Sequence, residues 1–234
     1  EKMWPLKKAW LQNVPNLTLV TPSGWLKNLV SQSFLSGYPV RVIHNGISLS
    51  TFCPTAGNFR QKYGLQNKKI VLGVASAWSN RKGLDAFLSL AQQLDNSFKI
   101  VLVGAGNQNS TALPGNVLWI PKTENAAQLA EIYSAADVFF NPTREENYPT
   151  VNMEALACGT PVVTFNTGGC AEIVGSGVGS VVPTGSLSAA KQSILNLCGP
   201  GKISPQACTE YAQRFSGSQT LREYCNLFQE LLQS

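Results

Sequence analysis

The stretch KKIVLGVASAWSNRKGLDAFLSLAQQLDNSFKIVLVGAG, residues 68–106, decides the fold class of this 234-residue chain. It contains two apolar runs, KKIVLGVAS and FKIVLVGAG, and the pattern between them predicts a helix over Leu84 to Leu94. Runs as apolar as these are typical of strands that are buried on both faces, as in parallel sheets covered by helices. The stretch therefore predicts a strand–helix–strand unit of an α/β fold.

The same alternation continues on either side of this unit. Strands are predicted in NLTLV, YPVRVI, NVLWIP, ADVFFNP, TPVVTF and GVGSVVP, and helices over residues 24–34, 126–135, 151–157, 188–197, 205–215 and 219–232. We therefore expect a Rossmann-like, doubly wound parallel sheet. In such sheets ligands bind beyond the carboxyl ends of the strands, so the chemistry should lie in the segments that follow each strand.

The segment NGISLSTFCPTAG, residues 45–57, is rich in turn-forming residues and predicts a domain boundary. We expect residues 1–50 to be the tail of a preceding domain with its connection, and residues 51–234 to form the main domain with its carboxyl-terminal helices. The chain begins with Glu1 and has no apolar leader, so we expect it to be part of a larger protein.

Charged residues are scarce, at 13% of the chain, against roughly a quarter in an ordinary soluble domain. With 44% hydrophobic residues this composition excludes intrinsic disorder and a coiled coil. The longest stretch without a charge, Ile100 to Pro121, contains too many polar residues for a membrane-spanning helix. The net charge of +5 is mild, so we expect a soluble protein and no nucleic-acid partner.

The cysteine and histidine pattern points away from a metal site. The six cysteines include no C-x-x-C pair, and His44 is the only histidine, so ligand spacing for a structural metal is missing. We expect the cysteines to be small buried hydrophobes of a reducing compartment. His44 precedes a turn and is expected to serve there or as a hinge.

The segment NPTREENYPTVNMEALACGTPVV, residues 141–163, carries the most distinctive chemistry. We expect a helix to begin near Thr150, with Thr150 as its N-cap and Glu154 in its first turn. Taken singly, Glu146 is an ordinary surface charge and Glu154 a carboxylate that favours a helix start. Together, they lie beside a helix N-terminus at the carboxyl edge of a sheet, which binds anions, and carboxylates there can accept hydrogen bonds from sugar hydroxyls. Lys82, before Gly83 at another strand-to-helix junction, is a candidate phosphate ligand.

Six blocks of sequence, in order, resemble one family. They are VIHNGISLSTFCP, NRKGLDAFLSLAQQL, FKIVLVGAG, LAEIYSAADVFFNP, EENYPTVNMEALACGTPVV and TGGCAEIV. The chain resembles the carboxyl-terminal, donor-binding half of retaining GT-B glycosyltransferases of glycosyltransferase family 4 (group 1). Glu146 and Glu154, with seven residues between them, match the family's E-x7-E pair.

The resemblance implies a role for each matched position. Glu146 would contact hydroxyls of the donor sugar, and Glu154 the ribose of the nucleotide. Lys82 would neutralise the diphosphate, with help from backbone N–H groups around Tyr148, Thr150 and Val151. The base would lie beside the loop after NVLWIP, at Pro121 and Lys122. Glu172 is expected to be structural.

Two positions depart from the family pattern. The family usually has an Arg a few residues before the matched Lys, whereas this chain has GVASAWSN there, with no Arg. Arg81 is the candidate for the second positive charge. Pro149 stands where many relatives have Gly, and it removes one backbone donor.

The resemblance implies transfer of a sugar from a UDP- or GDP-linked donor to a glycan or lipid-linked acceptor with retention of configuration, without a metal or other cofactor. It also implies a cytoplasmic location, with room for peripheral contact at the inner face of a membrane. The partner is the missing amino-terminal GT-B domain. Other readings are a non-catalytic nucleotide-binding module and a GT-B-fold epimerase or phosphorylase. A glycosidase is disfavoured because no second acid lies in a clearly apolar pocket near Glu146.

Overall fold

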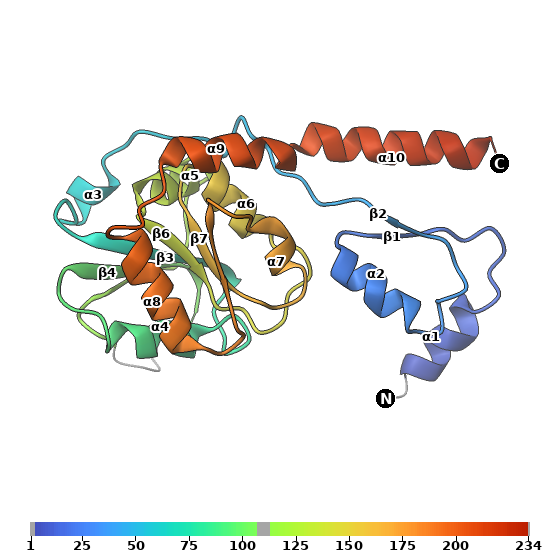
Figure 1. The fold of residues 1–234 in the computed structure, drawn as a ribbon, viewed down its shortest axis with the longest axis horizontal. Coiled ribbons are helices and arrows are strands. Elements are labelled where there is room, and N and C mark those ends of the chain that lie inside the picture. Colours follow the sequence, from blue (N-terminus) through green and yellow to red (C-terminus); the bar gives the residue numbers. More distant parts are fainter. Residues whose placement is uncertain (1–2, 107–112, 234) are drawn as a thin grey trace.

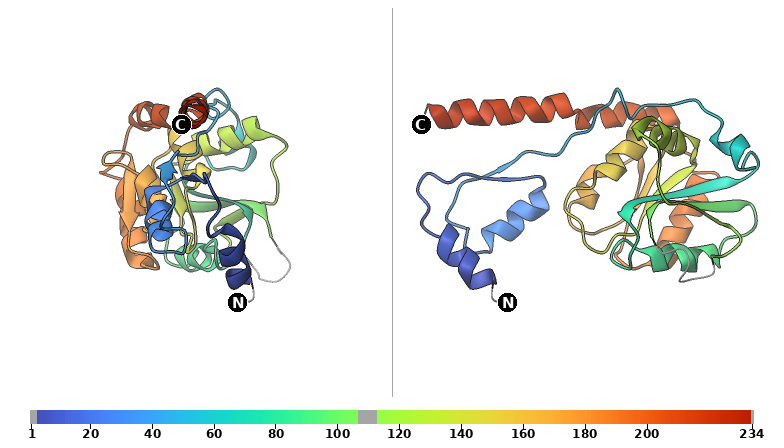
Figure 2. Two further views of the ribbon diagram at one scale, coloured as in Figure 1. Left: turned by 90° about the vertical axis from the view of Figure 1, so that its right-hand side faces the viewer. Right: turned by 180° about the vertical axis from the view of Figure 1, so that it is seen from behind.

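The computed structural model describes residues 3–106 and 113–233 (Figure 1). A small amino-terminal part comes first and comprises α1 (Met3–Leu11), β1 (Leu19–Thr21), α2 (Gly24–Ser31) and β2 (Val40–Val42). Its two strands pair in parallel. Figure 2 shows this part standing beside the larger body, to which it is joined by an extended connection and by the helix at the carboxyl end of the chain.

The larger body is built on a parallel sheet with the order β5-β4-β3-β6-β7-β8. Its strands are β3 (Lys69–Ala77), β4 (Phe98–Ala105), β5 (Val117–Ile120), β6 (Val138–Asn141), β7 (Val162–Phe165) and β8 (Gly179–Val182). The chain runs outward from β3 to β5 and then returns to the other side of β3 with β6. The sheet therefore has a topological switch point between β3 and β6, where ligands of doubly wound folds bind.

Both faces of the sheet are buried, because successive side chains of its central strands alternate between two hydrophobic clusters. Ile70 and Leu72 of β3 face one cluster, and Val71 between them faces the other. The first cluster includes side chains of α5 (Ala126–Ala135), α6 (Thr150–Ala157) and α9 (Pro205–Ala212). The second includes side chains of α4 (Leu84–Ala91) and α8 (Leu187–Leu197). The nearly continuous apolar runs follow from this double burial.

The remaining elements are short, apart from the last helix. They are α3 (Phe59–Lys62), α7 (Cys170–Ile173), the 3-10 turn η2 (Gln213–Phe215) and α10 (Gly217–Leu232). Helix α10 leaves the larger body and extends over the amino-terminal part (Figure 1). An ion pair of 2.7 Å between Arg41 and Glu230 joins the two there. None of the described helices has the length and apolar content needed to cross a bilayer.

The predicted fold class is confirmed. Helices α1 and α3 lie outside the helices predicted from the sequence, and other differences lie at the ends of elements. The helix predicted to reach Leu94 ends at Ala91, and the helix predicted over residues 205–215 divides into α9 and η2. All six cysteines are free, three of them buried. The division of the chain into domains at residue 50 stays a prediction.

Candidate functional site

A cavity of about 310 Å³ lies at the switch point of the sheet. Its wall combines the carboxyl ends of β3 and β6, the loop that leads into α4, and the loop and first residues of α6. The lining residues are Val74, Ala75, Ser76, Trp78, Lys82, Phe140, Asn141, Pro142, Glu146, Tyr148, Pro149, Thr150 and Val151. Five of the residues predicted from the sequence are among them: Lys82, Glu146, Tyr148, Thr150 and Val151.

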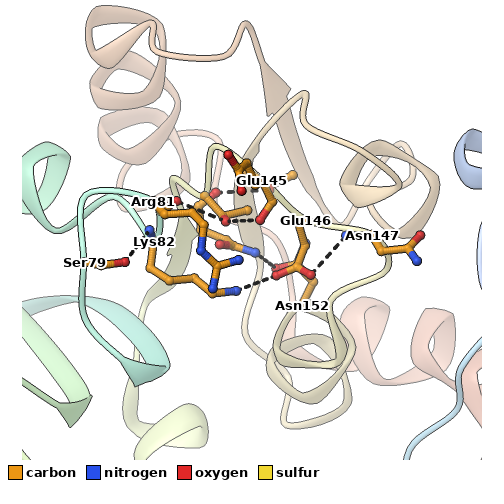
Figure 3. A network of polar contacts seen from close by, with 10 residues as sticks. Ser79, Arg81, Lys82, Glu145, Glu146, Asn147 and Asn152 are labelled. Atoms are coloured by element: carbon orange, nitrogen blue, oxygen red, sulfur yellow. Dashed lines mark hydrogen bonds and ion pairs between the residues drawn. The ribbon is translucent and has the colours of Figure 1, made fainter. Parts of the chain in front are cut away.

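Lys82 and Glu146 form an ion pair in this cavity, with 2.6 Å between Nζ and Oε2 (Figure 3). Both side chains are about one-fifth exposed, 23% for Lys82 and 21% for Glu146. The other carboxylate oxygen of Glu146 accepts the backbone N–H of Asn147 at 3.0 Å. A cation and a carboxylate from loops 64 residues apart in sequence therefore meet in this cavity.

Two glycines, one before α4 and one in the loop after β7, approach the loop that carries Glu146 closely. Gly83 precedes α4 with φ of 77°, and a Cβ there would lie 2.5 Å from the carbonyl oxygen of Pro142. Gly168 has φ of 56°, and its Cβ would lie 1.8 Å from the carbonyl oxygen of Glu146. Only glycine combines a left-handed backbone with so close an approach. The two glycines therefore set the positions of Lys82 and Glu146.

An ion pair outside the cavity connects α4 with the loop that carries Glu146. The Arg144 guanidinium pairs with both carboxylate oxygens of Asp85 in α4, at 2.8 and 2.6 Å. The N–H of Arg144 donates to the carbonyl of Arg81 at 2.9 Å. The Arg144 hydrogen bond lowers the pKa of the Asp85 carboxyl, so the contact is charged near neutral pH.

The start of α6 forms the second polar wall of the cavity. Pro149 is the N-cap and Thr150 the first helical residue, so the prediction of Thr150 as N-cap is wrong by one position. The first N–H groups of a helix have no partners within it, and together with the helix dipole they favour an anion. Tyr148, just before the helix, stacks on His44 with 4.7 Å between ring centroids.

Glu154 is the fifth residue of α6, which places it beyond the predicted first turn. It does not line the cavity. The Tyr133 hydroxyl, which is fully buried, donates to Glu154 Oε2 at 3.0 Å. Burial raises the pKa of the Glu154 carboxyl, although hydrogen bonds from Tyr133 and Thr150 oppose that rise.

Three other predicted residues lie outside the cavity wall. Arg81 is exposed, and its side chain runs in the same direction as that of Lys82 in the view of Figure 3. Pro121 and Lys122 are exposed and follow β5, which is separated from β3 by β4. Their assignments to the phosphate and the base stay predictions. Glu172 has a structural contact, as expected, because it accepts the N–H groups of Gly24 and Trp25 at 2.9 and 2.8 Å.

Sequence reasoning missed two prominent residues of the cavity wall. Trp78 lies in the stretch from which the family Arg is missing, and its indole donates to the carbonyl of Val103 at 3.2 Å. Asn141 is the last residue of β6. A polar residue at the end of an apolar strand beside a switch point is the signal that could have identified Asn141. Among residues 3–106 and 113–233, no three His, Cys, Asp or Glu side chains are grouped to hold a metal ion.

Comparisons with known proteins identify the family and the fold. The profile of the family "Glycosyl transferases group 1" matches residues 56–215. Alpha-maltose-1-phosphate synthase of Mycobacterium tuberculosis is 32% identical over 165 residues, which are 63% of this chain and 41% of that protein. Sucrose-phosphate synthase from Thermosynechococcus elongatus superposes with a TM-score of 0.83 at 21% identity, over 97% of this chain and 61% of the other.

A third similar structure, Anabaena Alr3699/HepE in complex with UDP-glucose, superposes with a TM-score of 0.79 at 18% identity, over 97% of this chain and 67% of the other. The chain belongs to the glycosyl transferases of group 1, and its fold corresponds to the carboxyl-terminal half of a GT-B enzyme. It spans less than half the length of the mycobacterial relative.

Proposed function

We propose that this chain is the donor-binding half of a retaining glycosyltransferase that uses a nucleotide sugar. The observation that carries the proposal is the Lys82–Glu146 ion pair, which lies at the switch point beside the start of α6. A cation, an array of backbone N–H groups and a carboxylate in one cavity suit a substrate with a diphosphate on one side and sugar hydroxyls on the other.

In this proposal the site promotes the reaction mainly by electrostatic stabilisation. Breaking the bond between the sugar and the diphosphate leaves negative charge on the departing phosphate. Lys82 and the N–H groups at the start of α6 are fixed donors that stabilise that charge as it develops. Lys82 is paired with Glu146, so a bound diphosphate would replace or join that carboxylate as its partner.

The two glutamates have separate roles in this proposal. Glu146 lines the cavity and accepts hydrogen bonds from hydroxyls of the donor sugar. Glu154, whose carboxylate accepts a hydrogen bond from the Tyr133 hydroxyl, also accepts one from the ribose. The acceptor, a glycan or a lipid-linked glycan, is held by an amino-terminal GT-B domain, and contact with a membrane surface belongs to that part of the proposal.

The first test is calorimetric titration of the chain with UDP, GDP and ADP. UDP is the first choice because the Anabaena structure of the same fold holds UDP-glucose. We expect at least one nucleotide to bind, and Lys82→Ala to weaken its binding by about 10- to 100-fold, because a hydrogen bond between charged groups is lost. The matched control is Lys202→Ala, an exposed lysine that does not line the cavity.

Two outcomes would contradict the proposal. The absence of binding to all three nucleotides would show that this cavity is not a donor site. Equal affinities of the parent and Lys82→Ala would remove the phosphate role of Lys82. Binding without any sugar transfer, once the chain is joined to its amino-terminal half, would favour a non-catalytic nucleotide-binding module.

A further inference from the structure

Two asparagines meet at the edge of the cavity. The Asn141 amide nitrogen donates to Asn152 Oδ1 at 2.8 Å, and Asn152 lies in the first turn of α6, close to Glu146 in the view of Figure 3. Asn141 is 8% exposed and Asn152 is fully buried. Within the described residues, the Asn152 amide nitrogen is the one buried side-chain nitrogen or oxygen without a hydrogen-bond partner.

A buried amide without a partner destabilises a fold, and such groups persist where they serve a purpose. Packing alone gives no reason for this pair, since two apolar side chains of similar shape would leave no polar atom unsatisfied. Asn141 differs from Asn152 in lining the cavity, in which Lys82 is the cation. The pair therefore connects the buried interior with the cavity.

The two amides can exchange their orientations together. In the present orientation Asn141 gives its nitrogen to Asn152 and keeps its own oxygen for other partners. If both amides turn, Asn152 donates to Asn141 Oδ1, and the Asn141 nitrogen becomes free to donate into the cavity. In either arrangement, one buried atom of the Asn152 amide lacks a hydrogen-bond partner. The number of hydrogen bonds therefore does not favour one arrangement over the other. A bound ligand would decide between them.

We propose that Asn141 is a further phosphate-binding residue, which turns its amide nitrogen toward the donor diphosphate, and that Asn152 is the positioning residue that permits the turn. This inference rests on the proposed function. An anion beside Lys82 repels a carbonyl oxygen and attracts an N–H donor, so diphosphate binding selects the turned arrangement. No other partner is required, because Asn152 can offer either its oxygen or its nitrogen to Asn141.

Two substitutions of Asn141 test whether its side chain donates a hydrogen bond to the ligand or accepts one from it. Asn141→Ala removes the donor, and we expect UDP to bind about tenfold more weakly. Asn141→Asp replaces the donor with a carboxylate, so we expect binding to be weaker still. If instead the Asn141 oxygen accepted a hydrogen bond from the ligand, Asn141→Asp would bind better than Asn141→Ala. The matched control is Asn28→Asp, in exposed α2 and outside the cavity wall.

A second measurement does not depend on the variants folding. In the ¹⁵N-labelled parent chain, the side-chain NH₂ resonances of Asn141 should shift when inorganic pyrophosphate is added, while those of Asn28 should not. Unchanged Asn141 resonances in pyrophosphate-bound protein would overturn the inference, as would parent-like UDP affinity in both variants. Either result would leave the proposed function intact if the parent binds nucleotide. Failure of the parent to bind UDP, GDP, ADP and pyrophosphate would overturn both proposals.

Discussion

Glu154 is a carboxylate whose surroundings disfavour its charged form. Burial outweighs the hydrogen bonds from Tyr133 and Thr150 in raising the pKa of its carboxyl. Burial also raises the pKa of Tyr133 well above its usual value, so the hydroxyl remains protonated and acts as a donor. The pair is therefore a neutral donor and a poorly solvated acceptor, and a ribose hydroxyl would supply the carboxylate with a further donor.

This environment predicts a pH-dependent effect of Glu154→Gln. Because the pKa of Glu154 is higher in the folded than in the unfolded chain, its contribution favours folding at pH values below the unfolded pKa. That contribution is lost as the pH rises through the folded pKa. The free energy of unfolding of Glu154→Gln, relative to that of the parent, should therefore be higher at pH 8 than at pH 4. Urea unfolding at both pH values measures it.

The same variant should weaken nucleotide binding by about tenfold, because an amide oxygen is a weaker acceptor than a carboxylate. Glu124→Gln, at an exposed position, serves as the control for both measurements. A relative stability of Glu154→Gln that is the same at pH 4 and pH 8 would contradict the burial of this carboxyl. Unchanged affinity would contradict its ribose role.

At the residue scale, the sequence indicates which residue types the candidate site contains and how far apart they stand in the chain. It does not indicate where their side chains point. Lys82 and Glu146 could be predicted because each follows a strand whose carboxyl end faces the switch point. Arg81, next to Lys82, could not be assigned to the cavity wall, because adjacent residues in a turn need not point the same way. Trp78 and Asn141 were missed because an aromatic residue or a lone amide at a strand end is more often structural than functional.

At the scale of elements, the turn before α4 decides whether Lys82 reaches Glu146. The Lys82 N–H donates to the carbonyl of Ser79 at 3.0 Å, and Gly83 then takes a left-handed backbone against Pro142. An alanine at position 83 is opposed both by its backbone angle and by the Pro142 carbonyl. The turn would have to move, and Lys82 with it.

Gly83→Ala should therefore reduce both stability and nucleotide affinity. The left-handed backbone alone costs about 1–2 kcal/mol for a non-glycine residue. Gly64→Ala is a matched control, because Gly64 also has a positive φ, of 65°, but no atom lies within 4 Å of the Cβ position. We expect Gly64→Ala to lose only the backbone contribution in urea unfolding and to bind UDP like the parent. Equal losses of stability and affinity in the two variants would refute the role of the close approach to Pro142.

The elements themselves were predicted better than their ends. The apolar runs of β3 and β4 could be recognised because both faces of each strand are buried, which makes the whole run apolar. The end of α4 at Ala91 and the division between α9 and η2 could not be predicted, because tertiary packing decides where a marginal turn of helix stops. The order of strands in the sheet likewise depends on contacts between distant segments.

For the whole molecule, the amino-terminal part is held against the larger body by hydrogen bonds and a ring stack. Ser23 Oγ donates to Asn147 Oδ1 at 2.6 Å, next to Glu146 in the candidate site. Glu172 accepts the first two N–H groups of α2, and His44 stacks on Tyr148. The amino-terminal part therefore contacts the loop that carries Glu146 directly.

Removal of the Glu172 carboxylate should loosen this contact without disrupting the sheet. Glu172→Ala leaves the Gly24 and Trp25 N–H groups without their acceptor and removes a favourable charge at the start of α2. We expect faster hydrogen exchange in peptides covering residues 19–31, with unchanged protection of β3 and β4, measured by mass spectrometry. Glu210→Ala removes a carboxylate on α9 that accepts a hydrogen bond from Gln206 of the same helix, and it serves as the control. Unchanged exchange over residues 19–31 would mean that other contacts hold the amino-terminal part. Faster exchange throughout the sheet would mean that Glu172 stabilises the larger body itself.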